Sequence, residues 1–184
     1  MKIGIISDTH GCAATWEKVY HQYFSECELI IHAGDILYHG PRNDIPAEYH
    51  PKQLATALNA CKIPIIVAAG NCDADVDGMV LTMPIQSPYA YIMLEGMPIV
   101  VNHGHTLTEQ TKQEMAVKFK AALFITGHTH IPVLEKINGI VYLNPGSPAM
   151  SKATDGRGTI ARLVNHTIEV LDVETGKVLM SEQL

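Results

Sequence analysis

The sequence predicts an α/β fold in which two packed β-sheets carry helices on their outer faces. Short apolar runs recur along the chain, each followed by a cluster of Gly, Asp, Asn or His. Helical patterns separate the first of these runs, and short turns join the later ones. The 184 residues suit one domain, since domains usually contain about 100–200 residues. No linker or internal repeat divides the chain, so we expect a single domain over residues 1–184.

Five apolar runs are predicted to form buried strands. Each run is short, continuously apolar and rich in β-branched residues, which is typical of strands buried on both faces. The five runs are Ile3–Ile6, Leu29–Ile31, Ile63–Ala68, Ile99–Val101 and Leu123–Ile125. Because helical patterns separate the first three runs, we expect these strands to pair in parallel through helical crossovers.

Three helices are expected between these strands. The first is marked by apolar residues at helical spacing, which are Trp16, Val19, Tyr20, Tyr23 and Phe24. Pro51 suits the first position of a second helix, with Leu54 and Leu58 on its apolar face. Thr111 and Glu114 have the spacing of a capping box at the start of a third helix.

Turn signals change the character of the second half of the chain. Asn138-Gly139, between two apolar runs, is the strongest short hairpin signal available. Glu95-Gly96-Met97, Asn165-His166 and Thr175-Gly176 also separate apolar segments. We therefore expect an antiparallel meander in this half, packed as part of a two-sheet sandwich.

The composition excludes several classes of protein. Lys and Arg number 13 against 19 Asp and Glu, and this net charge of −6 argues against a general nucleic-acid binder. No apolar run approaches the ~20 residues that a membrane span needs, and the apolar N-terminal part is too short for a secretory signal. The four cysteines form no C-x-x-C pair and are expected to be free thiols in the cytoplasm. Membrane partners are not expected, and the sequence does not decide whether the chain forms a homo-oligomer.

Side chains that can bind metal follow all five predicted strands. In an open α/β fold, ligands bind beyond the carboxyl ends of the parallel strands. The residues placed there are Asp8, His10, Asp35, Asn71, His103, His128 and His130. This set exceeds what one ion can use, and it suits two ions that share a bridging carboxylate. Any one of these motifs alone would occur often by chance, but five of them in order at strand ends would not.

The same segments resemble the motifs of the calcineurin-like metallophosphoesterases. They are Asp8-Thr9-His10, Gly34-Asp35, Gly70-Asn71-Cys72-Asp73, His103-Gly104-His105 and Gly127-His128-Thr129-His130. With Gly40-Pro41-Arg42-Asn43 and Asn144-Pro145-Gly146-Ser147, they are similar specifically to the small bacterial YfcE-type phosphodiesterases. The resemblance spans nearly the whole chain. It implies a four-layer αββα sandwich of two mixed β-sheets flanked by helices, with a dinuclear metal centre.

The resemblance also implies which residues hold each metal ion. One ion would take Asp8, His10 and His130, and the other Asn71, His103 and His128, with Asp35 bridging both. The implied reaction is hydrolysis of a small phosphodiester by in-line attack of a hydroxide held between the two ions. Mn²⁺ is the expected metal, with Fe, Zn²⁺ and Ni²⁺ as alternatives.

Cys72 stands where many members of this superfamily carry a histidine. A thiol with an ordinary pKa of about 8.5 donates a proton poorly at neutral pH, so we expect diesters with good leaving groups to be favoured over ordinary monoesters. His105 joins Asn71 and Cys72 as a candidate catalytic residue, with a ligand-orienting or surface position as the alternative. His39 and Arg42 are candidate substrate-binding residues, Arg42 through pairing with phosphate. A solvated or subunit-contact arginine is the alternative for Arg42.

Two other functions compete with this enzyme. A catalytically weak scaffold of the same fold, as in one retromer subunit, would be favoured by a damaged ligand set, but all seven positions are filled. A metallo-β-lactamase-type hydrolase would need His-x-His-x-Asp-His on one loop, which the chain lacks. The loops at Leu37–Tyr49, Asp73–Met83 and Ala149–Arg157 are expected to set specificity, and the sequence leaves the substrate open.

Overall fold

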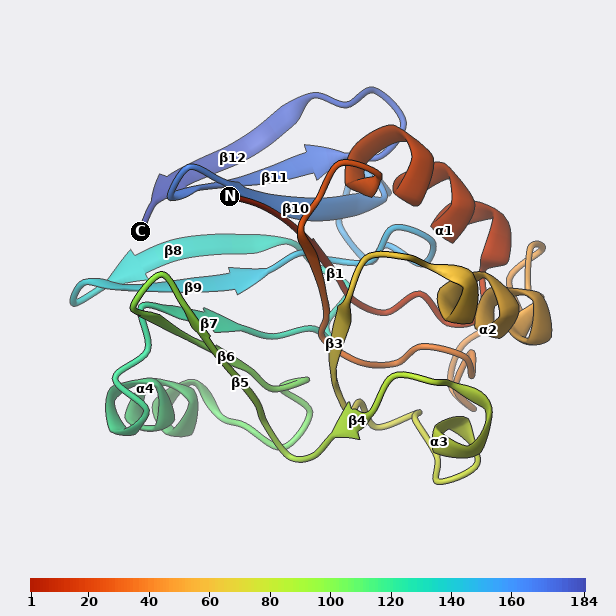
Figure 1. Ribbon diagram of the computed structural model, residues 1–184, viewed down its shortest axis with the longest axis horizontal. Coiled ribbons are helices and arrows are strands. Elements are labelled where there is room, and N and C mark those ends of the chain that lie inside the picture. Colours follow the sequence, from red (N-terminus) through yellow and green to blue (C-terminus); the bar gives the residue numbers. More distant parts are fainter.

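Two mixed β-sheets pack face to face in the computed structural model, which describes all 184 residues (Figure 1). The larger sheet contains β1 (Lys2–Ile6), β2 (Leu29–His32), β3 (Ile65–Ala68), β4 (Ile85–Gln86), β10 (Thr159–Val164), β11 (Thr167–Asp172) and β12 (Val178–Gln183). The smaller sheet contains β5 (Ala90–Leu94), β6 (Met97–Val101), β7 (Leu123–Ile125), β8 (Val133–Ile137) and β9 (Ile140–Asn144). Their strand orders are β12-β11-β10-β1-β2-β3-β4 and β5-β6-β7-β9-β8.

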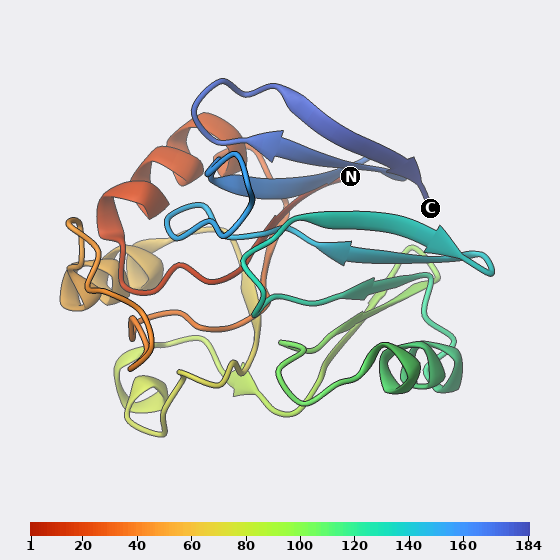
Figure 2. The same ribbon diagram turned by 180° about the vertical axis from the view of Figure 1, so that it is seen from behind.

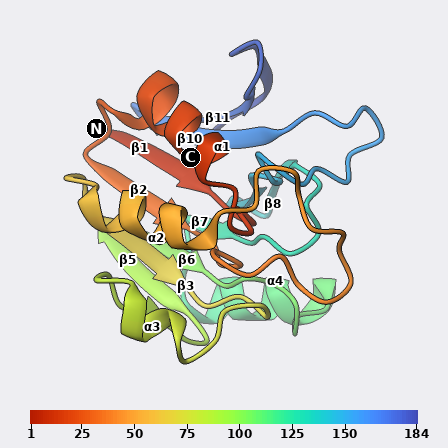
Figure 3. The ribbon, with the colours of Figure 1, turned by 90° about the vertical axis from the view of Figure 1, so that its right-hand side faces the viewer.

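Helices cover the outer face of each sheet. They are α1 (Ala13–Val19), which continues as the π-helical segment η1 (Tyr20–Phe24), α2 (Pro51–Ala60), α3 (Asp77–Val80) and α4 (Glu109–Lys118). Figure 3 shows α1 and α2 lying across β1, β2 and β3, where Trp16 and Leu54 are buried in their shared core. On the other side of the molecule α4 buries Ala116 against Phe124 and Tyr142 of the smaller sheet (Figure 2). The predicted four-layer αββα sandwich is confirmed.

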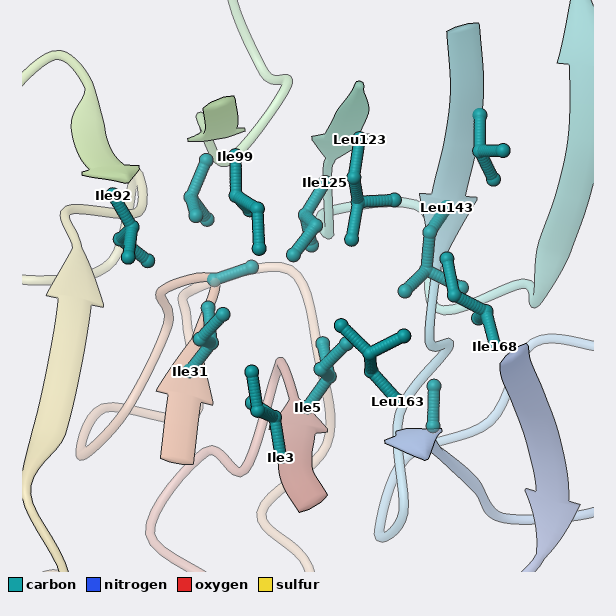
Figure 4. Close-up of a cluster of buried hydrophobic side chains, with 14 of the residues drawn as sticks. Ile3, Ile5, Ile31, Ile92, Ile99, Leu123, Ile125, Leu143, Leu163 and Ile168 are labelled. Carbon is teal, nitrogen blue, oxygen red and sulfur yellow. The ribbon is translucent and has the colours of Figure 1, made fainter. Parts of the chain in front are cut away.

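The central core is built from the inner faces of both sheets. Isoleucine and leucine side chains from the two sheets point toward one another and interdigitate, as Figure 4 shows for Ile5 and Ile31 of one sheet and Ile125 and Leu143 of the other. These side chains are between 0% and 1% exposed. Full burial of such a side chain stabilises the fold by about 1.5–3 kcal/mol, so this layer fixes how the two sheets sit against each other.

The second half of the chain is not the pure antiparallel meander expected from its turns. The hairpins β5–β6, β8–β9 and β10–β11–β12 are antiparallel as predicted. However, β6 pairs with β7 in parallel, and β7 pairs with β9 in parallel. The crossover through α4 returns the chain to the start of β7, and continuous apolar strands such as Leu123–Ile125 are typical of that buried parallel pairing.

Several element boundaries also differ from the predictions. The third helix begins at Glu109, and its capping box pairs Thr108 with Thr111 rather than Thr111 with Glu114. The Oγ1 atom of Thr108 accepts the backbone N–H of Thr111 at 3.1 Å, and the Thr111 hydroxyl accepts the N–H of Thr108 at 2.8 Å. Short elements without a clear pattern, namely β4 and α3, were not predicted.

The carboxyl ends of β1, β2, β6 and β7 meet at one edge of the sandwich. Asp8 N–H donates to the carbonyl of Gly34 at 2.9 Å, and Gly127 N–H donates to the carbonyl of His103 at 3.0 Å. The Nδ1 atom of His103 reaches across to the carbonyl of Ala33 at 2.7 Å, which joins the two sheets at this edge. None of the helices is long and apolar enough to cross a membrane.

Candidate metal centre

Five strand ends bring the predicted metal-binding side chains together. Asp8 and His10 follow β1, Asp35 follows β2, Asn71 follows β3, His103 follows β6, and His128 and His130 follow β7. The ligand atoms of Asp8, His10 and His130 lie within 4.8 Å of one another, and so do those of Asp35, His103 and His128. Each group therefore combines residues from both sheets.

The two groups border a cavity of about 420 Å³. Only one of its 12 lining residues is hydrophobic. Asn71, Cys72 and Arg42 line it as the sequence analysis proposed, and Lys152, which the sequence did not single out, lines it as well. A polar cavity of this size suits a small charged ligand.

Four predicted site residues do not line this cavity: Asp8 and His103 are fully buried, and His39 and His105 lie outside it. His39 packs edge-on against Tyr38 and Tyr49, with ring centroids 4.7 Å and 5.0 Å away. His105 is exposed, with its ring centroid 5.5 Å from that of His103. His39 and His105 are therefore not placed to contact a substrate in the cavity, and their roles stay predictions.

The backbone adopts the left-handed region at five of the candidate ligands. Their φ angles are 55° at Asp8, 43° at His10, 57° at Asp35, 68° at His128 and 59° at His130. Residues other than glycine rarely adopt this region, and each such residue costs about 1–3 kcal/mol. Conformations of this kind concentrate at functional sites, and here they accompany the sharp turns that follow β1, β2 and β7.

Asp73 holds the loops after β2 and β3 in place, a role that the sequence analysis missed. Its carboxylate accepts the backbone N–H groups of Asp35, Ile36 and Gly70 at 2.9, 2.8 and 2.7 Å. At Gly70 any Cβ atom would collide with the Asp35 carboxylate. The position of this acid directly after Asn71-Cys72 was the available signal.

Three of the imidazoles are clamped by backbone carbonyls. The Nδ1 atoms of His10, His103 and His130 lie 2.7, 2.7 and 2.6 Å from the carbonyl oxygens of Tyr38, Ala33 and Met150. Because a carbonyl oxygen only accepts, Nδ1 carries the proton, and in the neutral ring Nε2 presents its lone pair. Metal-binding histidines are oriented in the same way.

These lone pairs converge on the centre of the site. The Nε2 atoms of His10 and His130 face each other at 3.1 Å, and Oδ1 of Asp8 lies 3.2 Å from Nε2 of His130. Oδ1 of Asp8 and Nε2 of His103 are buried and have no hydrogen-bond partner. Buried polar atoms without partners are rare and costly, and cations placed among them would satisfy all of these atoms. The donor set therefore fits divalent metal ions of intermediate hardness.

The electrostatics of the site point the same way. Burial alone would raise the pKa of Asp8, but the imidazoles of His10 and His130 outweigh burial and hold that pKa well below its usual range. Burial alone would lower the pKa of His103, but the carboxylates of Asp35 and Asp8 raise it to about 9. Positive charge is thus favoured at the centre, whether it comes from protons or from metal ions.

Cys72 lies against the same carboxylates. Its Sγ atom belongs to a third close group with His10 and Asp35, and its backbone N–H donates to Oδ1 of Asp35 at 2.7 Å. Burial, and then the negative charge of Asp35, raise the pKa of the Cys72 thiol to about 12. The thiol is thus a poorer proton donor than the ordinary value used in the sequence analysis implies.

Asn144 and Ser147 support the ligand-bearing loops from behind. The Ser147 hydroxyl donates to the backbone carbonyl of Asp8 at 2.7 Å. The side-chain amide of Asn144 donates to the backbone carbonyl of Gly127 at 2.7 Å. Both residues belong to the Asn144-Pro145-Gly146-Ser147 segment, which the sequence analysis quoted without assigning it a role.

Comparison with known proteins agrees with this geometry. The sequence model of the calcineurin-like phosphoesterase superfamily domain matches residues 1–167. Phosphodiesterase YfcE of Escherichia coli is 35% identical over 153 residues, which is 83% of this chain and 82% of that protein. The solved structure of E. coli YfcE, a phosphoesterase, superposes with a TM-score of 0.87 at 29% identity, covering 100% of this chain and 99% of that one.

A more distant structure shares the fold alone. Vps29 of Entamoeba histolytica, solved in complex with Zn²⁺, gives a TM-score of 0.67 at 18% identity, covering 100% of this chain and 98% of that one. The family match covers most of the chain, and residues from four of the five quoted segments line one polar cavity. This chain belongs to the calcineurin-like phosphoesterase superfamily.

Proposed function

We propose that this protein is a metal-dependent phosphodiesterase that works with two divalent ions. The observation that carries the proposal is the pair of ligand groups that meet at one edge of the sandwich, where Oδ1 of Asp8 and Nε2 of His103 are buried without a hydrogen-bond partner. Two metal ions held in this way are a common means of hydrolysing phosphate esters. The similarity to YfcE, which is named a phosphodiesterase, supports the same reaction here.

We assign the ligands of each ion as the resemblance to the calcineurin-like metallophosphoesterases implies. One ion would be held by Asp8, His10 and His130, and the other by Asn71, His103 and His128. Oδ2 of Asp35 lies 3.7 Å from Nε2 of His10 and 3.3 Å from Nε2 of His103, so this carboxylate reaches both groups and is the proposed bridge. Mn²⁺ is the proposed metal because the set mixes carboxylate, amide and imidazole, with Fe, Zn²⁺ and Ni²⁺ as alternatives.

The residues of the chain position the reaction. When bound, the two ions supply Lewis acidity and a nucleophilic hydroxide at neutral pH. Arg42 and Lys152 line the cavity, and their positive charges pair with the phosphoryl oxygens of a diester. Cys72 offers that diester only a weak hydrogen bond, so the leaving group departs with little help from a protein acid.

The first experiment compares a diester with a monoester. Metal-stripped protein is supplied in turn with Mn²⁺, Zn²⁺, Ni²⁺ and Fe²⁺ and assayed on bis(p-nitrophenyl) phosphate and p-nitrophenyl phosphate. We expect metal-dependent cleavage of the diester, faster than that of the monoester and lost in Asp35→Asn. Bound metal is counted by elemental analysis in both proteins. Absence of turnover with all four metals would favour the scaffold instead.

We further propose that residues 1–184 act as one domain in the cytoplasm. All four cysteines are free, and Cys12 and Cys27 are buried, which suits a reducing compartment. Formation of a homo-oligomer is a separate proposal that light scattering tests directly.

A further inference from the structure

An apolar groove lies next to the polar metal cavity. It has a volume of about 580 Å³, and eight of its 11 lining residues are hydrophobic. Its walls come from two loops and from the start of α2. Leu37, Tyr38 and Tyr49 belong to the loop after β2, and Val76 and Val80 to the segment after β3. The groove and the metal cavity therefore differ sharply in polarity although they are neighbours.

The two spaces share Cys72 as a lining residue. The groove walls are also continuous with the ligand-bearing loops, because Tyr38 lies three residues after Asp35 and its carbonyl oxygen clamps Nδ1 of His10 at 2.7 Å. Ala74, on the other wall, lies three residues after Asn71. The groove therefore lies beside a molecule bound at the metal cavity, with Cys72 between the two spaces.

Large apolar side chains remain exposed to water in this groove. Tyr38 is 41% exposed, Val76 58% and Val80 48%. Exposed apolar side chains are ordinary when scattered singly, but three that line one concave surface mark a place where apolar material binds. The volume of the groove is within the range of about 300–1,000 Å³ that is usual for small-molecule sites.

We propose that this groove binds one ester group of the substrate, and that this group is aromatic or similarly apolar. The scissile phosphate occupies the polar cavity, while the apolar arm passes Cys72 and lies against Tyr38, Val76 and Val80. The proposal rests on the proposed phosphodiesterase function and names its substrate class. The position of the groove directly beside the metal cavity, with Cys72 in the lining of both, favours a substrate arm over a partner protein or a second copy of the chain.

Competition between matched phosphodiesters tests the proposal. Diphenyl phosphate and dimethyl phosphate are used as competitors of bis(p-nitrophenyl) phosphate hydrolysis by the Mn²⁺-loaded protein. Both competitors carry the same single negative charge, and only one carries apolar rings. We expect half-inhibition by diphenyl phosphate at a concentration at least about tenfold below that of dimethyl phosphate, because the rings are buried in the groove.

Substitutions on the groove wall locate the effect. Val76→Ser combined with Val80→Ser removes apolar surface from two exposed positions, so the fold should be retained. This double variant should lose most of the preference for diphenyl phosphate and keep its response to dimethyl phosphate and its metal content. Val117→Ser is the matched control, because Val117 is 64% exposed on α4, on the other side of the molecule.

The outcomes separate the two levels of the proposal. Without metal-dependent hydrolysis of bis(p-nitrophenyl) phosphate by the unaltered protein, the phosphodiesterase function itself fails. With hydrolysis present, equal inhibition by the two competitors, or a preference that the double variant retains, overturns the groove assignment. The groove assignment would also be overturned if the unaltered protein were a dimer and the double variant a monomer, because the groove would then be an interface between copies.

Discussion

At the residue scale, the site depends on histidine side chains that use Nδ1 for a hydrogen bond to the backbone and leave Nε2 free for a metal ion. His10, His103 and His130 donate from Nδ1 to backbone carbonyls, and their Nε2 atoms are left to face the carboxylates. The imidazoles are therefore oriented before any metal arrives. Cys72, which faces the same centre, keeps its proton, and this sets its chemistry apart from that of a histidine.

Cys72→His should shift the protein toward monoesters. A histidine titrates near neutral pH and can protonate a poor leaving group, whereas the pKa of Cys72 is raised to about 12. We expect the ratio of p-nitrophenyl phosphate to bis(p-nitrophenyl) phosphate turnover to rise by at least about tenfold. Cys72→Ser serves as the control for size. An unchanged ratio in Cys72→His would show that this position does not govern the leaving group.

His32 gives the fold a distinct pH dependence. Gly34 N–H donates to Nδ1 of His32 at 3.1 Å, so Nε2 carries the proton toward the hydroxyl of Thr9 at 3.0 Å, and the ring has no need of a second proton. Burial lowers the pKa of His32 to about 4. A lowered folded-state pKa stabilises the fold above the unfolded value of about 6.5, and this stabilisation is lost as the pH falls from there toward 4.

The expected loss is about 3 kcal/mol in the free energy of unfolding across that pH window. Urea unfolding of metal-free protein at pH 7 and pH 4 measures it. His32→Asn keeps an acceptor for Gly34 N–H and does not titrate, so its free energy of unfolding should depend less on pH. Equal pH dependence in both proteins would mean that other groups, such as the buried carboxylates, account for the acid sensitivity.

At the element scale, the turns after the strands bear the candidate ligands, and these turns pack tightly against one another. Five candidate ligands adopt positive φ angles, and Asp73 ties the turn after β2 to the turn after β3. Gly34 and Gly70 approach so closely that a Cβ on Gly34 would lie 2.6 Å from the backbone nitrogen of Gly70. A substitution in these turns is therefore expected to weaken metal binding more than it disturbs the packing of the hydrophobic core.

Gly70→Ala should empty at least part of the site. The added methyl group collides with the Asp35 carboxylate, which is the proposed bridge. We expect fewer than two ions per chain by elemental analysis and a fall in kcat/KM of about 100-fold or more, since a displacement of 1 Å can cost that much. Gly78→Ala in α3 is the matched control, because nothing lies within 4 Å of its Cβ position. Two bound ions and full activity in Gly70→Ala would contradict this reading of the turn.

The elements that the sequence predicted well are those with a strong local pattern. The buried strands and the Asn138-Gly139 hairpin follow from apolar runs and turn residues, and the strand ends then bring the candidate ligands together. The start of the third helix was misplaced because Thr108 and Thr111 cap it with hydroxyl groups instead of the Thr-Glu pair. Parallel pairing of β7 with β9 and the groove beside Cys72 arise from tertiary contacts, which no local pattern records.

At the scale of the whole molecule, stability and metal binding are linked. The ligand groups assemble only in the folded chain, so ions that bind there stabilise the fold by mass action. Addition of Mn²⁺ to chelator-treated protein at about 1,000 times its dissociation constant should therefore raise Tm by about 10 °C. Scanning calorimetry measures the shift, and Asp35→Asn should show a much smaller one. An unchanged Tm would contradict preferential binding of the ion to the folded chain.

The distribution of the ligands over two sheets has a consequence for core design. Asp8, His10 and Asp35 move with the larger sheet, and His103 and His128 move with the smaller one. A slight sliding of one sheet over the other would misalign both ion pockets without exposing any apolar surface. Volume-conserving exchanges in the isoleucine layer between the sheets are therefore expected to slow turnover while the Tm of the metal-free protein changes little, so that core positions distant from the site influence the rate.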